Sequence, residues 1–154
     1  LTGIFNRRVG LTLLGKEMDR VHRYGYRFTL CFIDVNGLKP VNDEYGHEEG
    51  DELILTVVRM VEESMRGGDV LCRIGGDEFL LLFRDCDMGS AELVRERMEE
   101  SFRRINESGK KSYEISVSYG LIEYDKESEY SVQELLHRAD SRMYEDKMKR
   151  KSVR

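Results

Sequence analysis

The sequence predicts an α+β sandwich, in which helices flank a central, mainly antiparallel sheet. Three observations predict it: helix-like and strand-like segments alternate along the 154 residues, one pair of strands is joined tightly at Gly75-Gly76, and no linker or repeat divides the chain. A series of strands separated by helices, with one hairpin among them, is close to a ferredoxin-like βαββαβ core. We therefore expect residues 1–154 to form a single domain, a size that one hydrophobic core supports.

The first half of the chain predicts a helix, a strand and a second helix. The first helix ends near Tyr24-Gly25 and has apolar residues at helical spacing, namely Leu11, Leu14, Met18 and Val21. The run RFTLCFIDV, residues 27–35, is almost continuously apolar and predicts a buried strand. A short loop follows, in which Pro40 suits the first turn of a helix. Segment 48–68 then predicts a helix that Gly67 ends, with one face formed by Leu53, Ile54, Val57, Val58, Val61 and Met65.

The second half predicts a hairpin, a helix, a strand and a last helix. Residues 70–74 and 79–83 form the hairpin, because the two glycines between them tolerate the positive φ of short turns. The next helix carries Val94, Met98, Phe102 and Ile105, and residues 112–124 alternate as a strand does. Ser131 and Glu134 resemble a capping box at the start of the last helix. The predicted order is α-β-α-β-β-α-β-α.

Charge and composition exclude several classes of protein. A net charge of −5 argues against a general nucleic-acid surface, which needs a basic stripe to neutralise phosphates. The apolar runs are far shorter than the ~20 residues of a membrane span, and no signal peptide is visible. Cys31, Cys72 and Cys86 lie in or beside apolar runs without CxxC spacing, which predicts buried thiols. We expect a cytoplasmic domain that binds neither nucleic acid nor membrane through this segment.

Two acidic turns are candidates for a functional site. Asp34 ends the first strand, and Asn36-Gly37 follows it in a loop whose N–H groups suit phosphate oxygens. Asp77-Glu78 lie in the hairpin turn, and Asp34 and Asp77 converge if the hairpin lies beside the first strand. Clustered carboxylates suit Mg²⁺. The same residues fit an ordinary glycine turn and a strand-end cap, so the local pattern leaves both interpretations open.

Five sequence blocks, in order along nearly the whole chain, carry a resemblance to a known family. They are LTGIFNRR, DVNGLKPVNDEYGHEEGDELI, RIGGDEF, SVSYG and RADSRMYEDK. The chain resembles the GGDEF domains, diguanylate cyclases that condense two GTP into cyclic di-GMP and whose fold is similar to nucleotide cyclase palm domains. Five ordered blocks are far more specific than one short motif.

The resemblance implies a metal site that is also the catalytic site. Asp34, Asp77 and the carbonyl of Val35 would bind Mg²⁺, or Mn²⁺ in its place, and Glu78 would add a carboxylate. Gly75 and Gly76 of the signature turn would leave room for the nucleotide. The metal would stabilise charge as the 3′-hydroxyl of one GTP attacks the α-phosphate of another and expels pyrophosphate.

The resemblance also implies how GTP is held. Asn42 and Asp51 match the guanine-recognising pair, since a carboxylate accepts from the N–H edge that adenine lacks; as an alternative, both residues are polar helix caps. The phosphate contacts would come from Asn36, Gly37, Leu38, Lys39, Lys147 and Lys151. Lys151 stands where the family has arginine, which weakens that contact because lysine lacks the bidentate fork. We expect Lys149, Arg150 and Arg154 to be solvated.

A second site is implied by Arg66-Gly67-Gly68-Asp69, which matches the family's RxxD inhibitory site in its spacing from GGDEF. There an arginine binds phosphate and a carboxylate accepts from guanine of the product, with Arg97 as a second arginine from the same or another subunit. RxxD is a weak signal when taken alone. The alternative makes Arg66 a cation at a helix C-terminus and Asp69 a turn residue.

Cyclic di-GMP is two-fold symmetric, so one half-site holding one GTP is insufficient. We expect a transient homodimer in which each chain brings one GTP, controlled by a sensor segment upstream of this chain. The runner-up interpretation is a binding module that holds GTP or cyclic di-GMP without making product. A polymerase-like palm is the third, and it would require a basic template groove that the negative charge does not supply.

Overall fold

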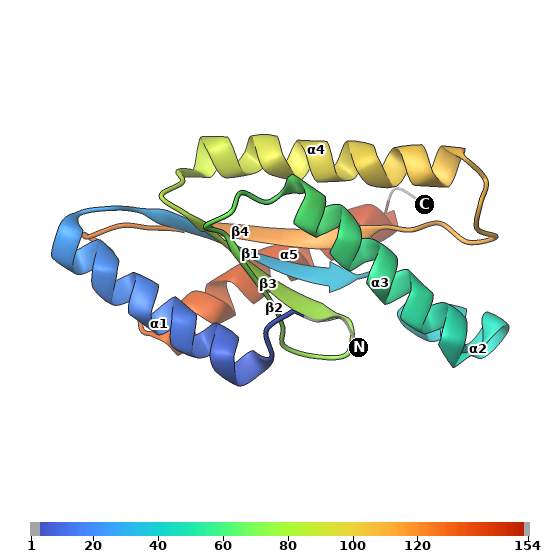
Figure 1. The fold of residues 1–154 in the computed structure, drawn as a ribbon, viewed down its shortest axis with the longest axis horizontal. Coiled ribbons are helices and arrows are strands. Elements are labelled where there is room, and N and C mark those ends of the chain that lie inside the picture. Colours follow the sequence, from blue (N-terminus) through green and yellow to red (C-terminus); the bar gives the residue numbers. More distant parts are fainter. Residues whose placement is uncertain (1–3, 153–154) are drawn as a thin grey trace.

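The computed structural model describes residues 4–152 and places helices on both faces of one sheet (Figure 1). In this range the helices are α1 (Arg7–Tyr24), α2 (Leu38–Tyr45), α3 (His47–Ser64), α4 (Met88–Glu107) and α5 (Val132–Ser152), and the strands are β1 (Phe28–Val35), β2 (Val70–Arg73), β3 (Glu78–Arg84) and β4 (Val117–Tyr124). The strand order is β2-β3-β1-β4, and all neighbouring strands are antiparallel. The predicted α+β fold with a ferredoxin-like core is confirmed.

The central strand β1 is buried along its whole length, because helices cover both faces of the sheet. Successive side chains point to opposite faces. Cys31 and Ile33 pack in the core formed with α3 and α4, whereas Leu30 and Phe32 pack with α1 and α5. In Figure 1, α4 lies along one side of the sheet and α5 crosses behind it. Asp34 lies two residues after Phe32, so its side chain points to the same face, toward α5. Asp34 is only 5% exposed.

The last helix lies against β4 at Gly120. A Cβ atom at this position would lie 2.0 Å from the carbonyl oxygen of Ala139 and 2.3 Å from the backbone nitrogen of Met143. Only glycine allows two backbones to approach so closely. Beside it, the backbone N–H of Tyr119 donates to Asp146 of α5 at 2.9 Å, which also covers the edge of the sheet. These contacts place the end of α5 beside the end of β1.

The segment after β1 differs from the prediction. Residues 38–45, expected as a loop, form α2, and Pro40 lies in its first turn, a position that suits proline. Gly46 alone joins α2 to α3 with a φ of 94°, which a side chain would disfavour. At its other end α3 stops at Ser64, before the predicted stop at Gly67, because the chain becomes extended at Met65.

The start of β4 also differs from the prediction. The strand begins at Val117 and not at residue 112. The side chain of Asn106 accepts from the N–H of Ile115 at 2.7 Å and donates to its carbonyl at 2.8 Å. Because these two bonds use the backbone polar groups of Ile115, this residue does not join the ladder.

Other local expectations are confirmed. The hydroxyl of Ser131 accepts from the N–H of Glu134 at 3.1 Å, as in the predicted cap of α5. All three cysteines are buried free thiols. In the described part of the chain, no helix is both long enough and apolar enough to span a membrane.

Candidate active site

Three carboxylates lie where β1 meets the hairpin. Asp34 of β1 and Glu78 of β3 are paired across the sheet, so their side chains share one face. The N–H of Val35 donates to the carbonyl of Asp77 at 2.8 Å, which holds the turn against the end of β1. The structure thus brings together the acidic groups that the sequence places at two separate turns.

One ammonium group from α5 reaches this acidic cluster. Lys147 donates from Nζ to Oδ2 of Asp34 at 2.7 Å. Burial nevertheless raises the pKa of Asp34, the bond to Lys147 opposes that rise, and the charge of Asp77 adds to it. Burial also raises the pKa of Glu78, as do the neighbouring carboxylates, whereas the bond to Asp34 raises the pKa of Lys147. The site therefore holds excess negative charge that favours a further cation.

One oxygen of the buried Asp34 carboxylate makes no hydrogen bond to the described residues. Among the described residues, its Oδ1 atom is a buried oxygen without a hydrogen bond. Such atoms are rare in folded proteins. Within residues 4–152, no three His, Cys, Asp or Glu side chains are gathered closely enough to hold a metal by themselves. Asp34 and Asp77 fit Mg²⁺ as it is bound with nucleotides, by one or two carboxylates together with substrate phosphates.

The glycine turn has a different backbone from the predicted one. Neither Gly75 nor Gly76 has a positive φ. A Cβ atom on Gly75 would lie 2.6 Å from Oε1 of Glu78, whereas the space at Gly76 is open. Arg73 donates from Nε to the carbonyls of both glycines at 3.2 Å, and the carbonyl of Glu78 accepts from the N–H groups of Ile74 and Gly75. Arg73, the last residue of β2, was not predicted as part of this turn, although it stands two residues before Gly75.

Asn36 has a structural task that the sequence analysis did not assign. Its backbone N–H donates to the carbonyl of Ser116 at 3.0 Å. Its side chain donates to the hydroxyl of Ser116 and accepts from that of Ser118, both at 3.0 Å. The predicted role in binding phosphate through this N–H conflicts with the structure, because the group already has an acceptor. Ser116 and Ser118 belong to the SVSYG block, and the two serines in that block could have indicated these contacts from the sequence.

The start of α2 presents backbone donors beside the acidic cluster. Gly37 has a φ of 75° and precedes the first turn, which contains Leu38 and Lys39. The first N–H groups of any helix lack acceptors within the helix, and they attract anions. Lys39 is exposed in this turn. Lys151 is exposed on α5 one turn beyond Lys147, so the two lysines lie on the same side of the helix.

The pair Asn42 and Asp51 lies at the corner between α2 and α3. Asn42 is half-buried on α2, and Asp51 is exposed near the start of α3. A Cβ atom on Gly50 would lie 1.7 Å from Oδ1 of Asn42. The Asn42 amide therefore rests against the backbone of α3 at Gly50. A glycine inside a helical segment could have indicated this close contact from the sequence.

Comparison with known proteins identifies the family. The family described as diguanylate cyclase, GGDEF domain, matches residues 1–152. The chain belongs to the GGDEF family. It is 31% identical over 147 residues to the probable diguanylate cyclase DgcC of Escherichia coli K12, and it covers 39% of that protein's length. The match covers 96% of this chain.

Solved structures agree with this assignment. The diguanylate cyclase SiaD of Pseudomonas aeruginosa, solved in complex with its activator SiaC, matches with a TM-score of 0.85 and 31% identity over 96% of this chain and 56% of that one. A microbial GGDEF domain described in a novel interaction mode with bis-(3,5)-cyclic di-GMP matches with a TM-score of 0.81 and 28% identity over 96% of this chain and 88% of that one.

The GGDEF domain has a second candidate site at Arg66 and Asp69. The two side chains lie 3.4 Å apart and line a cavity of about 430 Å³ together with Tyr26 and Arg84. The Asp69 side chain is only 2% exposed, and it accepts from the backbone N–H groups of Arg66 at 2.9 Å and Arg84 at 3.3 Å. Both carboxylate oxygens accept hydrogen bonds within the protein, so Asp69 orients Arg66, and its contact with guanine stays a prediction.

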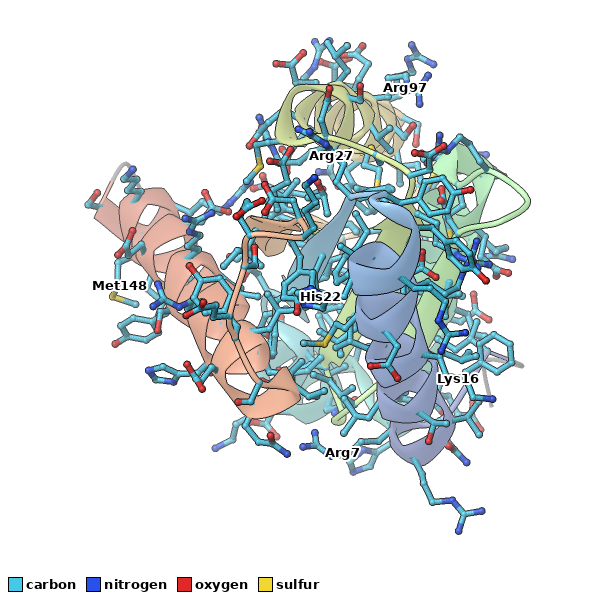
Figure 2. All side chains as sticks on the ribbon, turned by 90° about the vertical axis from the view of Figure 1, so that its left-hand side faces the viewer. Arg7, Lys16, His22, Arg27, Arg97 and Met148 are labelled. Atoms are coloured by element: carbon cyan, nitrogen blue, oxygen red, sulfur yellow. The ribbon has the colours of Figure 1, made fainter. Side chains whose placement is uncertain are left out.

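Arg97 and Arg150 of the GGDEF domain both lie away from the cavity at Arg66. Arg97 projects outward from α4, near the top of Figure 2, and does not line the cavity at Arg66. Arg150, expected to be solvated, is partly buried and bonds Glu99 at 2.8 Å and Asp146 at 3.0 Å. It ties α5 to α4. Arg154 and the first three residues of the LTGIFNRR block lie outside the described residues.

Proposed function

We propose that this GGDEF domain is a Mg²⁺-dependent diguanylate cyclase that condenses two GTP into cyclic di-GMP and releases two pyrophosphates. The observation that carries the proposal is the buried carboxylate of Asp34, which has Lys147 on one oxygen and no partner for the other. A buried charged group without full compensation is costly. Asp77 and Glu78 lie beside it, which supports a site prepared for a divalent cation and the phosphates that accompany it.

Each predicted group has a task in this reaction. Asp34, Asp77 and the carbonyl of Val35 would hold Mg²⁺, or Mn²⁺ in its place, and Glu78 would lie beside them as a further carboxylate. The ion would neutralise charge on the phosphates. The N–H groups at the start of α2, with Lys39, would bind phosphate oxygens.

The lysines of α5 and the pair at the α2–α3 corner complete the half-site. Lys147 would move from Asp34 to the triphosphate once a cation replaces it, and Lys151 would act as a more distant point charge. Asn42 and Asp51 would bind the N–H edge of guanine, so that adenine leaves their polar groups unpaired.

The reaction needs two copies of this half-site. The 3′-hydroxyl of each GTP attacks the α-phosphate of the other, and each attack expels one pyrophosphate. Because the two nucleotides are equivalent, we propose a homodimer with two-fold symmetry that holds them in attacking geometry. A sensor segment, if one is joined to this domain as we propose, would set how often the two domains meet.

We further propose that cyclic di-GMP inhibits the domain at Arg66. The cavity beside this arginine and its exposed guanidinium support the proposal. Asp69 would orient Arg66, and Arg97 would come from another subunit, since it lies away from this cavity. The three buried free thiols support a cytoplasmic location, where disulfides are rare.

The decisive experiment incubates the domain at high concentration with GTP and Mg²⁺ and follows pyrophosphate and nucleotide products. We expect cyclic di-GMP from the wild type and none from Asp77→Ala, with unchanged unfolding temperature. An active Asp77→Ala variant would show that the metal assignment is wrong. Retained GTP binding without turnover would favour the alternative, a GGDEF module that only binds nucleotide.

A second experiment tests the inhibitory site. Added cyclic di-GMP should inhibit the wild type much more strongly than Arg66→Ala. Equal inhibition of both proteins would remove Arg66 from the proposal.

A further inference from the structure

The linker between α4 and β4, residues 108–116, contacts the start of α3. Lys111 donates from Nζ to Oε1 of Glu49 at 2.6 Å, and the hydroxyl of Tyr113 donates to the same oxygen at 2.8 Å. The rings of Tyr113 and Tyr45 lie 5.5 Å apart, so the linker also touches the last residue of α2. Two donors and an aromatic contact thus converge on the corner between α2 and α3.

The same linker holds the other end of α2. Its last residue, Ser116, accepts from the backbone N–H of Asn36 and from its side chain, both at 3.0 Å. The bonds between Asn106 and Ile115 keep this part of the linker apart from the sheet. The linker therefore contacts both the segment before α2, which we propose binds phosphate, and the corner after α2, which we propose binds guanine.

Glu49 lies at the point where a displacement would affect both guanine-binding residues. It is in the first turn of α3, two residues before Asp51. Its neighbour Gly50 lies directly against the amide of Asn42, with no room for a Cβ atom. A shift of this turn moves Asp51 with the helix and removes the surface against which Asn42 rests.

A surface ion pair alone would contribute little to stability. The side chains of Lys111 and Glu49 are 30% and 29% exposed, so the pair is partly screened by water. The arrangement is more restrictive than a pair, because Tyr113 adds a hydrogen bond whose direction is set by a ring packed near Tyr45. Such geometry suits positioning better than stabilisation.

We propose that Lys111 and Tyr113 are positioning residues for guanine recognition. By holding Glu49 they set where the first turn of α3 places Asp51 and, through Gly50, Asn42. This inference rests on the proposed function, because it assigns that pair to the base of GTP. It extends the proposed nucleotide site to two linker residues that bond Glu49.

The test measures binding of 3′-deoxy-GTP and 3′-deoxy-ATP, which lack the attacking hydroxyl, by calorimetry with Mg²⁺. Tyr113→Phe and Lys111→Met should each weaken binding of the guanine nucleotide about three- to tenfold, the effect of one lost hydrogen bond. Binding of the adenine nucleotide should not change, so the ratio of the two affinities falls. Lys111→Arg keeps the ion pair and should keep the wild-type ratio.

Matched controls are available in the same chain. Lys110→Met alters the exposed neighbour of Lys111, and Tyr144→Phe removes an exposed hydroxyl on α5. Both should bind each nucleotide as the wild type does. Circular dichroism and thermal unfolding would show that all variants are folded.

The two possible failures are distinguishable. If the wild type itself binds both nucleotides equally, the guanine assignment of the proposed function is wrong, and this inference falls with it. If the wild type selects guanine and both Tyr113→Phe and Lys111→Met keep that selectivity, the linker only stabilises the fold. In that case the positioning role is refuted, and the proposed function is not.

Discussion

Replacing Gly50 with alanine should impair guanine recognition while the GGDEF domain stays folded. The added Cβ atom would lie 1.7 Å from Oδ1 of Asn42 and 2.8 Å from its Cγ. Ordinary contacts begin at 3.4 Å, so the amide oxygen must withdraw by about 1.7 Å. The obstructing atoms belong to a side chain and not to backbone, so Asn42 yields by changing its rotamer.

The two effects of this substitution differ in size. Alanine favours helical backbone over glycine by about 0.5–1 kcal/mol, which the displaced amide and a tight contact with Leu38 oppose. We therefore expect a free energy of unfolding within about 1 kcal/mol of the wild type. If Asn42 makes two hydrogen bonds to guanine, each worth about 0.5–1.5 kcal/mol, GTP binding weakens by about 5- to 150-fold.

Calorimetric binding of 3′-deoxy-GTP and urea unfolding measure the two effects. Gly15→Ala is the matched control, because Gly15 is also helical and a Cβ atom there meets nothing within 4 Å. It should stabilise the protein slightly and leave GTP binding unchanged. In an Asn42→Ala background, Gly50→Ala should not weaken binding further. A folded Gly50→Ala protein that binds GTP as the wild type does would refute the reasoning.

Three further predictions concern other parts of the domain. Gly120→Ala should lower the free energy of unfolding in urea by about 3 kcal/mol, the upper end of the usual overpacking range, because backbone obstructs its Cβ atom at 2.0 Å; wild-type stability would contradict the close approach of α5. Lys147→Met leaves the buried carboxylate of Asp34 unpartnered and should lower the free energy of unfolding by about 1–3 kcal/mol. Mg²⁺ should reduce that loss in thermal unfolding, and an equal loss with and without Mg²⁺ would contradict a cation site. Burial raises the pKa of Cys72 from 9.0 to about 11, so native alkylation by iodoacetamide at pH 8 should be about a hundredfold slower than in unfolded protein. The same shift gives stability that is present below pH 9 and is lost as pH rises through about 11, and rapid native labelling of Cys72 would contradict it.

The helices and strands with strong apolar periodicity were predictable because burial leaves a local pattern. Leu14, Met18 and Val21 all lie in the core of the α1 side of the sheet, as their spacing indicates. The continuous apolar run of β1 likewise indicates a strand covered on both faces, which the structure has. The helix α2 was not predicted, because its eight residues bury only Val41 and so carry little periodic signal.

The candidate site also contains residues that were predictable from the sequence and residues that were not. Asp34, Asp77 and Glu78 were predictable as acidic groups at strand ends, because their positions follow from the apolar runs around them. The bonds by which Asn36 holds the loop against the start of β4 were not predictable, because its partner Ser116 lies 80 residues away. The bond from the backbone N–H of Arg84 to Asp69 was not predictable either, because Arg84 lies 15 residues further along the chain.

The sequence by itself determined the α+β class and the family, and it named the candidate acidic, guanine-binding and RxxD residues, because periodicity and motifs are written in neighbouring residues. Only the tertiary structure decided that Lys147 meets Asp34, 113 residues earlier, and that Lys111 and Tyr113 hold Glu49. Those contacts depend on how α5 crosses β4 at Gly120 and how the α4–β4 linker packs on α3. The relative placement of elements arises from packing over the whole core, and no local pattern encodes it.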